Sequence, residues 1–289
     1  MPELPEVETV RKGLEPVLKN HVIADVELRR KNLRTPFPEN FGKTLVGARV
    51  TGTRRRAKYI LIDLSTPLTS PLKGGKEGGV LLVHLGMSGS FRTYAKGKDF
   101  TPETHDHVIF TLDNGMRVVF NDPRRFGVMD VFAANDEPEH KLLKHLGLEP
   151  LSNQFSGPAL AGLLARKNTA VKVAIMDQQL VVGVGNIYAS ESLFLAGIDP
   201  RKKARLVTGE RAERLASAIK EVLQAALESG GSTLRNYRQL DGDTGYFQHR
   251  FLVYGHAGQT CPCRIGKQHP VKSIVQGGRT TFFCPVKQR

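Results

Sequence analysis

The sequence contains no tryptophan, only three cysteines, and fewer acidic than basic residues. No stretch approaches the roughly 20 apolar residues that a membrane-spanning helix needs, and the first residues lack the pattern of a secretory signal. We therefore expect a cytoplasmic protein with no membrane partner. The cysteines are odd in number and all lie between positions 261 and 284, which favours a local C-terminal role over a disulfide framework.

The excess of basic residues is the clearest signal in the composition. The 289 residues include 42 Lys and Arg against 28 Asp and Glu, which gives a net charge of +14. Such an excess favours a polyanionic partner, most often nucleic acid, through phosphate contacts and counterion release. A membrane surface is the less common alternative.

The spacing of apolar residues changes twice along the chain. Runs such as YILIDL, VLLVHL and MRVVF predict a β-sandwich or barrel over residues 21–133, behind an N-terminal helix. Helical spacing follows from about residue 135, including HKLLKHLG and GERAERLASAIKEVLQAAL. From about residue 249 we expect strands again, FLVYG and then KSIVQGGRTTFFC, with Gly277 and Gly278 as a hairpin turn. The stretch STPLTSPLKGGKEGG, 65–79, predicts an exposed loop.

The chain opens with MPELPE, where removal of Met1 would free the secondary amine of Pro2. An α-amino group has a reference pKa of about 7.7 to 8.0, against about 10.4 for lysine, so near neutral pH it is partly unprotonated and nucleophilic. An iminium formed on proline has no N–H to lose and stays an electron sink. Glu3 could move protons at the same centre. The alternative is a frayed terminus with a solvent-exposed Glu3.

Three further segments could serve nucleic-acid chemistry. Lys58, between the basic cluster TRRR and an apolar strand, is a phosphate contact or a functional acid or base. Met87 in HLGMSGS can project from a tight loop, although a lone methionine is commonly a core residue. Arg124 and Phe126 in NDPRRFG suit a phosphate contact and an apolar wedge between bases. A structural turn capped by Asp122 is the competing interpretation.

The segment VVGVGNIYASES, 181–192, joins a glycine-rich loop to a predicted helix start. Its G-x-G lacks the third glycine of a dinucleotide-binding motif, and it lacks the flanking strand-to-helix context of such a site. Backbone N–H groups there, helped by Asn186, could bind a phosphate.

The cysteines lie where a small zinc site would be expected. Cys261, Cys263 and Cys284 are on or beside the predicted hairpin, and His269 could complete a Cys₃His set. The spacing is irregular, because neither of two C-x₂-C pairs is present. Zinc-binding and zincless fingers both stay open.

Seven motifs, taken in order, resemble the bacterial formamidopyrimidine-DNA glycosylases, which excise 8-oxoguanine and ring-opened purines. They are MPELPEVE, RRAKY, HLGMSGS, THDH, DPRRFG, MDQQLVVGVGNIYASESLF and GGRTTFFCP, and they run over nearly the whole chain. The resemblance implies an α+β multidomain fold. It consists of an N-terminal catalytic β-sandwich with flanking helices (1–134), a helix-two-turn-helix domain with a base-binding loop (135–248) and a C-terminal β-hairpin finger (249–289).

The resemblance also implies residue roles. Pro2 looks like the nucleophile that attacks C1′ and forms a Schiff base, Glu3 like the proton donor during base release, and Lys58 like the proton donor for β-elimination. Arg279 matches the finger arginine that grips phosphate and assists δ-elimination. Met87, Arg124 and Phe126 look like the trio that fills the gap left when the damaged base is flipped out. The other DNA-binding residues implied are His105, Lys167, Asn186 and Glu6. The stretch from Ser232 to Tyr246 resembles the loop that closes over the extruded base.

These roles imply a bifunctional glycosylase and AP lyase of base excision repair. It would act as a monomer on double-stranded DNA with oxidised purines or abasic sites, in the bacterial cytoplasm at the nucleoid, without an organic cofactor. The finger departs from the family, because Arg264 and Lys287 stand where cysteines are expected, so one zinc ion per chain is uncertain. The alternatives are an oxidised-pyrimidine endonuclease of the same superfamily, a non-catalytic lesion-binding protein and a basic RNA-associated protein.

Overall fold

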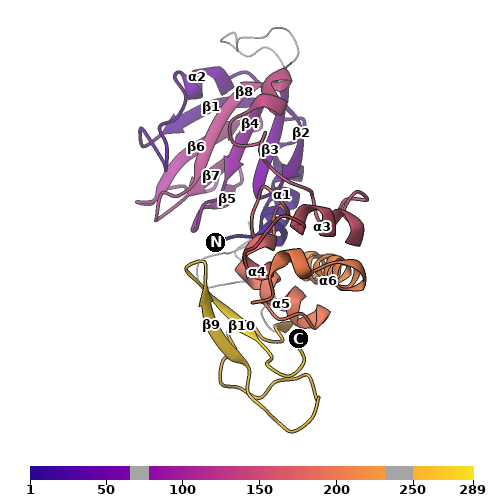
Figure 1. Cartoon of the computed structure of the whole chain (residues 1–289). Coiled ribbons are helices and arrows are strands. Elements are labelled where there is room, and N and C mark those ends of the chain that lie inside the picture. The colour runs from indigo at the N-terminus through magenta and orange to yellow at the C-terminus, as the bar shows by residue number, and fades with distance from the viewer. Residues whose placement is uncertain (66–77, 232–249) are drawn as a thin grey trace. The chain divides into compact units, whose positions relative to one another are not determined.

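The computed structural model describes residues 1–65, 78–231 and 250–289, which form two compact units (Figure 1). One unit is Met1–Lys144 with Gly231, and the other is His145–Gly230 with residues 250–289. The predicted base-binding loop and nearly all of the predicted loop 65–79 lie outside the described residues. The domain boundaries at 134 and 248 stay a prediction. Within the described ranges, no helix is long and apolar enough to cross a membrane.

The first unit is a sandwich of two four-stranded antiparallel sheets, which confirms the predicted fold class. One sheet has the order β1-β6-β7-β5 and the other β2-β3-β4-β8. The strands are β1 (Ile23–Leu28), β2 (Arg49–Arg56), β3 (Tyr59–Ser65), β4 (Gly79–His84), β5 (Ser90–Tyr94), β6 (Asp106–Leu112), β7 (Arg117–Asn121) and β8 (Val128–Ala133). The helices are α1 (Leu4–Leu18), α2 (Phe41–Leu45) and the 3₁₀ turn η1 (Ala134–Glu139).

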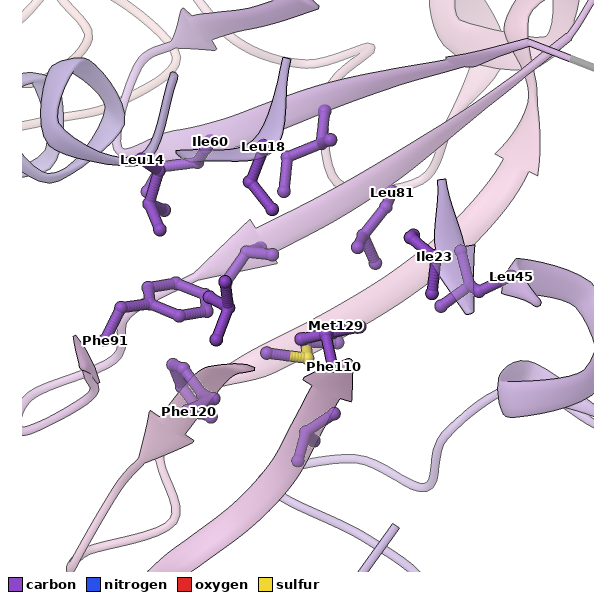
Figure 2. Packing of buried hydrophobic residues seen from close by; sticks show 14 of the residues in the cluster. Leu14, Leu18, Ile23, Leu45, Ile60, Leu81, Phe91, Phe110, Phe120 and Met129 are labelled. Atoms are coloured by element: carbon purple, nitrogen blue, oxygen red, sulfur yellow. The ribbon is translucent and has the colours of Figure 1, made fainter. Parts of the chain in front are cut away.

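Side chains from both sheets and from α1 form one hydrophobic core (Figure 2). Leu14 of α1, Ile60 of β3 and Phe120 of β7 are all fully buried in it. Burial of each large apolar side chain contributes about 1.5 to 3 kcal/mol. The core therefore anchors α1, and with it the residues at the N-terminus, against β2 and β3.

The second unit begins with helices and ends with the finger. Its elements are α3 (Gly157–Leu164), α4 (Val171–Ile175), α5 (Asn186–Ala196), η2 (Ala204–Leu206), α6 (Gly209–Glu228), β9 (Lys272–Gln276) and β10 (Arg279–Phe283). The long amphipathic α6 packs against α3 and α5. The helix predicted for HKLLKHLG is wrong, because residues 141–145 form turns. There the ring of His140 stacks on Phe132, with centroids 4.2 Å apart, and its Nε2 lies 3.3 Å from an Asp130 oxygen.

The finger is an antiparallel hairpin of β9 and β10. Gly277 and Gly278 connect the strands with φ of +54° and +72°, which confirms the predicted turn, since a two-residue turn of this kind requires positive φ at both positions. The strand predicted for FLVYG is wrong. The backbone N–H groups of residues 252–254 donate to the buried carboxylate of Glu191 on α5, at 2.8 to 3.0 Å, instead of to a neighbouring strand.

Candidate active site and nucleic-acid interface

The N-terminal residues are fixed by the start of α1. Pro2 is buried, and Glu3 is the N-cap residue of the helix. The backbone N–H of Glu3 donates to Glu6 Oε2 at 2.8 Å. Glu3 and Glu6 are 4% and 2% exposed, so the alternative of a solvent-exposed Glu3 is wrong. Pro2 is therefore held at a defined place at the start of α1, next to a buried carboxyl group.

Lys58 lies in the turn between β2 and β3. Ala57 adopts a φ of +55° in this turn, and the Lys58 side chain is buried, with 6% exposure. Lysine is almost never buried without a purpose or a partner. Such burial fits a functional acid or base better than the alternative of a surface phosphate contact.

His84, at the end of β4, is a further ionisable group of this region. Its ring faces Tyr59 across the β3–β4 pair, with centroids 5.0 Å apart. The pKa of His84 is lowered from 6.5 to about 4. Burial of the ring is the largest cause, and the positive charges of Lys58 and Arg34 add to it. The neutral ring accepts the N–H of Gly86 at Nδ1, at 3.1 Å, so its hydrogen is on Nε2. Arg34, Tyr59 and His84 line a pocket of about 680 Å³.

Met87 and Phe126 project from two neighbouring loops. They are 37% and 41% exposed, so Met87 is not a core methionine. The loop backbones touch, because a Cβ atom on Gly86 would lie 2.3 Å from the carbonyl carbon of Phe126. Arg124 places its guanidinium carbon 4.9 Å from the centre of the Phe126 ring. The structure thus brings the three predicted wedge residues together.

Asp122 closes the turn that carries Arg124 and Phe126. Its Oδ2 accepts the N–H of Gly127 at 2.7 Å, so the alternative interpretation of this segment as a capped turn also holds. The exposed residue His105, which directly precedes β6, accepts the backbone N–H of Asp122 on its carbonyl oxygen at 3.0 Å. The predicted DNA contact His105 is therefore attached to the base of the same turn.

In the second unit, α5 begins at Asn186, whose side chain is held on two sides. The fully buried Lys172 of α4 donates through Nζ to Asn186 Oδ1. Asn186 Nδ2 donates to the carbonyl oxygen of Thr280 on β10 at 2.8 Å. These two bonds fix which way the amide faces and leave one N–H of Nδ2 available. Together with the positive end of the helix dipole, that N–H could bind a phosphate.

Lys167 and Arg279 complete the predicted contacts of the second unit. Lys167 Nζ lies 3.7 Å from Asp177 Oδ2, and its side chain is 40% exposed. Arg279 is exposed at the start of β10, directly after the hairpin turn. Arg279, Lys167 and Asn186 thus belong to one compact unit, while Pro2 and its neighbours belong to the other.

The four predicted metal ligands come together in the finger. The ligand atoms of Cys261, Cys263, His269 and Cys284 all lie within 4.8 Å of one another. His269 Nε2 is 3.4 Å from Cys263 Sγ and 3.1 Å from Cys284 Sγ. The Nδ1–H of the same ring faces the carbonyl oxygen of Lys267 at 2.9 Å, which leaves Nε2 free to bind a metal. The cluster could hold one metal ion.

The turn after Cys284 carries only one thiol, and its backbone N–H groups face the sulfur of that thiol. The N–H of Lys287 donates to Cys284 Sγ at 3.1 Å. Burial raises the pKa of Cys284, but hydrogen bonds from the N–H groups of Lys287 and Val286 and with the thiols of Cys261 and Cys263 together lower it below its ordinary value. The Lys287 ammonium lies 4.5 Å from the centre of the Phe194 ring, away from a ligand position. His269 therefore lies where it could supply the ligand that Lys287 does not.

Comparison with known proteins gives the family. A family model described as the formamidopyrimidine-DNA glycosylase N-terminal domain matches residues 1–129, and one described as the H2TH domain of the same enzyme matches residues 146–238. The chain belongs to the formamidopyrimidine-DNA glycosylase family. Proteins of that name from Beijerinckia indica and Ruegeria pomeroyi are each 48% identical to it, over 300 and 297 residues, with full coverage of both chains.

Solved structures of the family have the same fold. The MutM (Fpg) protein from Thermus thermophilus is 39% identical, with a TM-score of 0.84 over 99% of this chain and 98% of that one. The Lactococcus lactis Fpg in complex with DNA containing an abasic site is 32% identical, with a TM-score of 0.85 over 99% of each chain. The resemblance inferred from the motifs is confirmed.

Two residues of this glycosylase-family site were missed by sequence reasoning. Lys172 lies in the apolar helix VKVAI, and a lysine at a buried helical position is itself a signal, because it requires a partner. His84 stands at the end of a strongly apolar strand, where its partial burial could have been expected. The partners of both residues depend on distances between elements, which no local pattern contains.

Proposed function

We propose that the chain is a bifunctional DNA glycosylase and AP lyase of base excision repair that removes 8-oxoguanine and formamidopyrimidines from double-stranded DNA. The observation that carries the proposal is the placement of Pro2 and Glu3, held at the start of α1 by Glu6, in a chain of this family. The net charge of +14 supplies the attraction to DNA phosphates. We propose that the protein acts as a monomer. We expect it to act in the bacterial cytoplasm, at the nucleoid.

The chemistry starts at the nitrogen of Pro2. After removal of Met1, this nitrogen attacks C1′ of the damaged nucleotide while the bond between C1′ and the base breaks. Glu3 supplies the proton during base release. The first product is an N-glycoside in which C1′ is bonded to the proline nitrogen and still to O4′. The C1′–O4′ bond then breaks as a proton passes from the nitrogen to O4′, and the ring-opened product is a cationic iminium between the proline nitrogen and C1′. It draws electrons from the bond to a C2′ proton, so the 3′ phosphate leaves first and the 5′ phosphate leaves in the second elimination.

The remaining residues bind DNA or move protons. Lys58 donates the proton of β-elimination from its buried position. Arg279 binds phosphate from the finger and assists δ-elimination, while Asn186 binds a backbone phosphate at the start of α5. Met87, Arg124 and Phe126 fill the space that the extruded base leaves. Further DNA contacts are assigned to His105, Lys167 and Glu6.

We propose that Cys261, Cys263, His269 and Cys284 hold one zinc ion. Three thiols and an imidazole nitrogen form the soft, tetrahedral donor set that structural zinc prefers. The ion would act as a crosslink between the loop before β9 and the end of β10, and so would steady the hairpin that carries Arg279. The expected result of metal analysis is about one zinc per chain. Purified protein free of zinc would contradict the assignment.

Borohydride trapping tests the proposed activity. Wild-type protein on an 8-oxoguanine duplex should give a covalent adduct, and Pro2→Gly should greatly reduce its yield. A normal yield from protein that retains Met1 would contradict the mechanism, because the nitrogen is then part of a peptide bond. A non-catalytic lesion-binding protein would give no adduct, and preference for a thymine glycol duplex would indicate the oxidised-pyrimidine endonuclease.

The Lys58→Ala variant separates the two activities. Strand cleavage at a preformed abasic site should suffer more than release of 8-oxoguanine, because Lys58 is assigned to β-elimination and Glu3 to base release. Lys98→Ala, which changes an exposed lysine of the same unit, serves as the control and should alter neither rate. An equal loss of both activities in Lys58→Ala would argue against the role assigned to Lys58.

A further inference from the structure

Asp122 is a fully buried carboxylate for which the proposed chemistry has no use. Its Oδ1 accepts the hydroxyl hydrogen of Ser88 at 2.5 Å, and its Oδ2 accepts the N–H of Gly127 at 2.7 Å. A buried charge is costly unless it is paired or hydrogen-bonded. The position of Asp122 is thus maintained by bonds to two different loops.

Ser88 is the other half of this connection. It directly follows Met87 and is 6% exposed. Its O–H donates to Asp122 Oδ1, and its oxygen accepts the backbone N–H of Arg124 at 3.1 Å. One hydroxyl group therefore links the loop of Met87 to the loop that carries Arg124 and Phe126.

The connection is also anchored to the sheet. The Nε2 atom of the buried ring of His107, on β6, faces the carbonyl oxygen of Asp122 at 2.9 Å. A carbonyl oxygen can only accept, so Nε2–H is the donor in this contact. Burial is the main cause that lowers the pKa of His107. Gly86 allows the two loop backbones to meet where any side chain would collide with the backbone at Phe126.

We propose that Ser88 and Asp122 are positioning residues that hold Met87, Arg124 and Phe126 as one preformed wedge. The inference rests on the proposed function, in which these three side chains enter the duplex. Without the connection, each loop would have to be ordered separately at every insertion, and the loss of conformational entropy would oppose extrusion of the base. With it, that ordering is already present in the free protein.

The Ser88→Ala variant tests the connection, with Ser90→Ala, the same deletion two residues along the chain, as its matched control. Single-turnover excision of 8-oxoguanine from a duplex should fall about tenfold in Ser88→Ala, as expected for loss of a buried hydrogen-bonded hydroxyl. Cleavage at a preformed abasic site should fall less than about threefold, because no stacked base has to be extruded there. Both rates should stay near the wild-type values in Ser90→Ala.

A fluorescent base analogue beside the lesion supplies a readout that simple destabilisation would not move. In stopped-flow measurements, the unstacking phase should be slower in Ser88→Ala, and Asp122→Asn should change it in the same direction. Loss of the folded fraction would instead lower the amplitude and leave the rate of this phase unchanged.

The possible failures can be told apart. Equal losses on the two substrates, or an unchanged excision rate in Ser88→Ala, would overturn the positioning role while the proposed function stands. Absence of a borohydride adduct with the wild-type protein would overturn the proposed function, and the inference with it.

Discussion

Replacement of His84 with asparagine should remove a pH-dependent part of the stability of the protein. The folded state lowers the pKa of this ring from 6.5 to about 4. The unfolded chain therefore takes up a proton near pH 6.5, while the folded chain resists it. The contribution of His84 to stability is complete above pH 6.5 and is lost as the pH falls toward 4. At about 1.36 kcal/mol per pKa unit, the full loss is about 3 kcal/mol.

Urea unfolding at about pH 7 and about pH 4.5 measures this quantity. Asparagine offers an amide oxygen to the N–H of Gly86 but does not titrate. Between the two pH values, the free energy of unfolding should fall by about 2 to 3 kcal/mol more in the wild type than in His84→Asn. Protonation of carboxylates lowers the stability of both proteins equally and cancels in this difference. Tyr59→Phe keeps the ring that packs on His84 and should retain the wild-type pH dependence. The same pH dependence in wild type and His84→Asn would refute the reasoning.

Three further substitutions probe the other parts of the structure. Lys172→Met should weaken duplex binding by about fivefold to twentyfold, since it removes a charge-assisted hydrogen bond, and should leave the salt slope in fluorescence anisotropy unchanged because this lysine is buried. Gly86→Ala should lower the free energy of unfolding in urea by more than about 3 kcal/mol, whereas Gly97→Ala, also at positive φ but in open space, should lose about 1 kcal/mol. In chelator competition, His269→Ala should lose zinc affinity by at least about tenfold, and His256→Ala should not. A changed salt slope, equal losses in the two glycine variants, or equal affinities in the two histidine variants would each contradict the corresponding reasoning.

The β-sandwich and the finger hairpin could be predicted because their signals are local. Alternating apolar runs mark the strands, and two successive glycines mark the turn at Gly277 and Gly278. The strand expected at FLVYG failed because a distant carboxylate, Glu191, takes the N–H groups that a sheet would have used. Local patterns carry no information about such a competitor.

In the candidate site, the reactive groups could be predicted from the sequence, but the contacts that position them could not. The amine of Pro2 follows from elementary reactivity and its place in the sequence, whereas the contact between Glu3 and Glu6 that fixes it requires the helix. The NDPRRFG segment offered a wedge and a capped turn as alternatives, and in the structure Asp122 serves the turn while Phe126 projects from it. Short motifs cannot show that both descriptions apply at once.

The finger is the part where this chain differs from the pattern of its family. Sequence spacing left zinc open, because Arg264 and Lys287 stand at expected cysteine positions. The folded finger gathers His269 and the three thiols within 4.8 Å. A ligand from a different loop is invisible to a search for C-x₂-C pairs, since folding, and not spacing, brings it to the site.

The attachment point of DNA on the protein tests the central claim most directly. The complex with an 8-oxoguanine duplex is reduced with borohydride and digested, and the modified peptide is identified by mass spectrometry. We predict a peptide that begins at Pro2, lacks Met1 and carries the sugar remnant on the proline nitrogen. A remnant on a lysine such as Lys58, or on a chain that still begins with Met1, would contradict the assignment of Pro2 as the nucleophile.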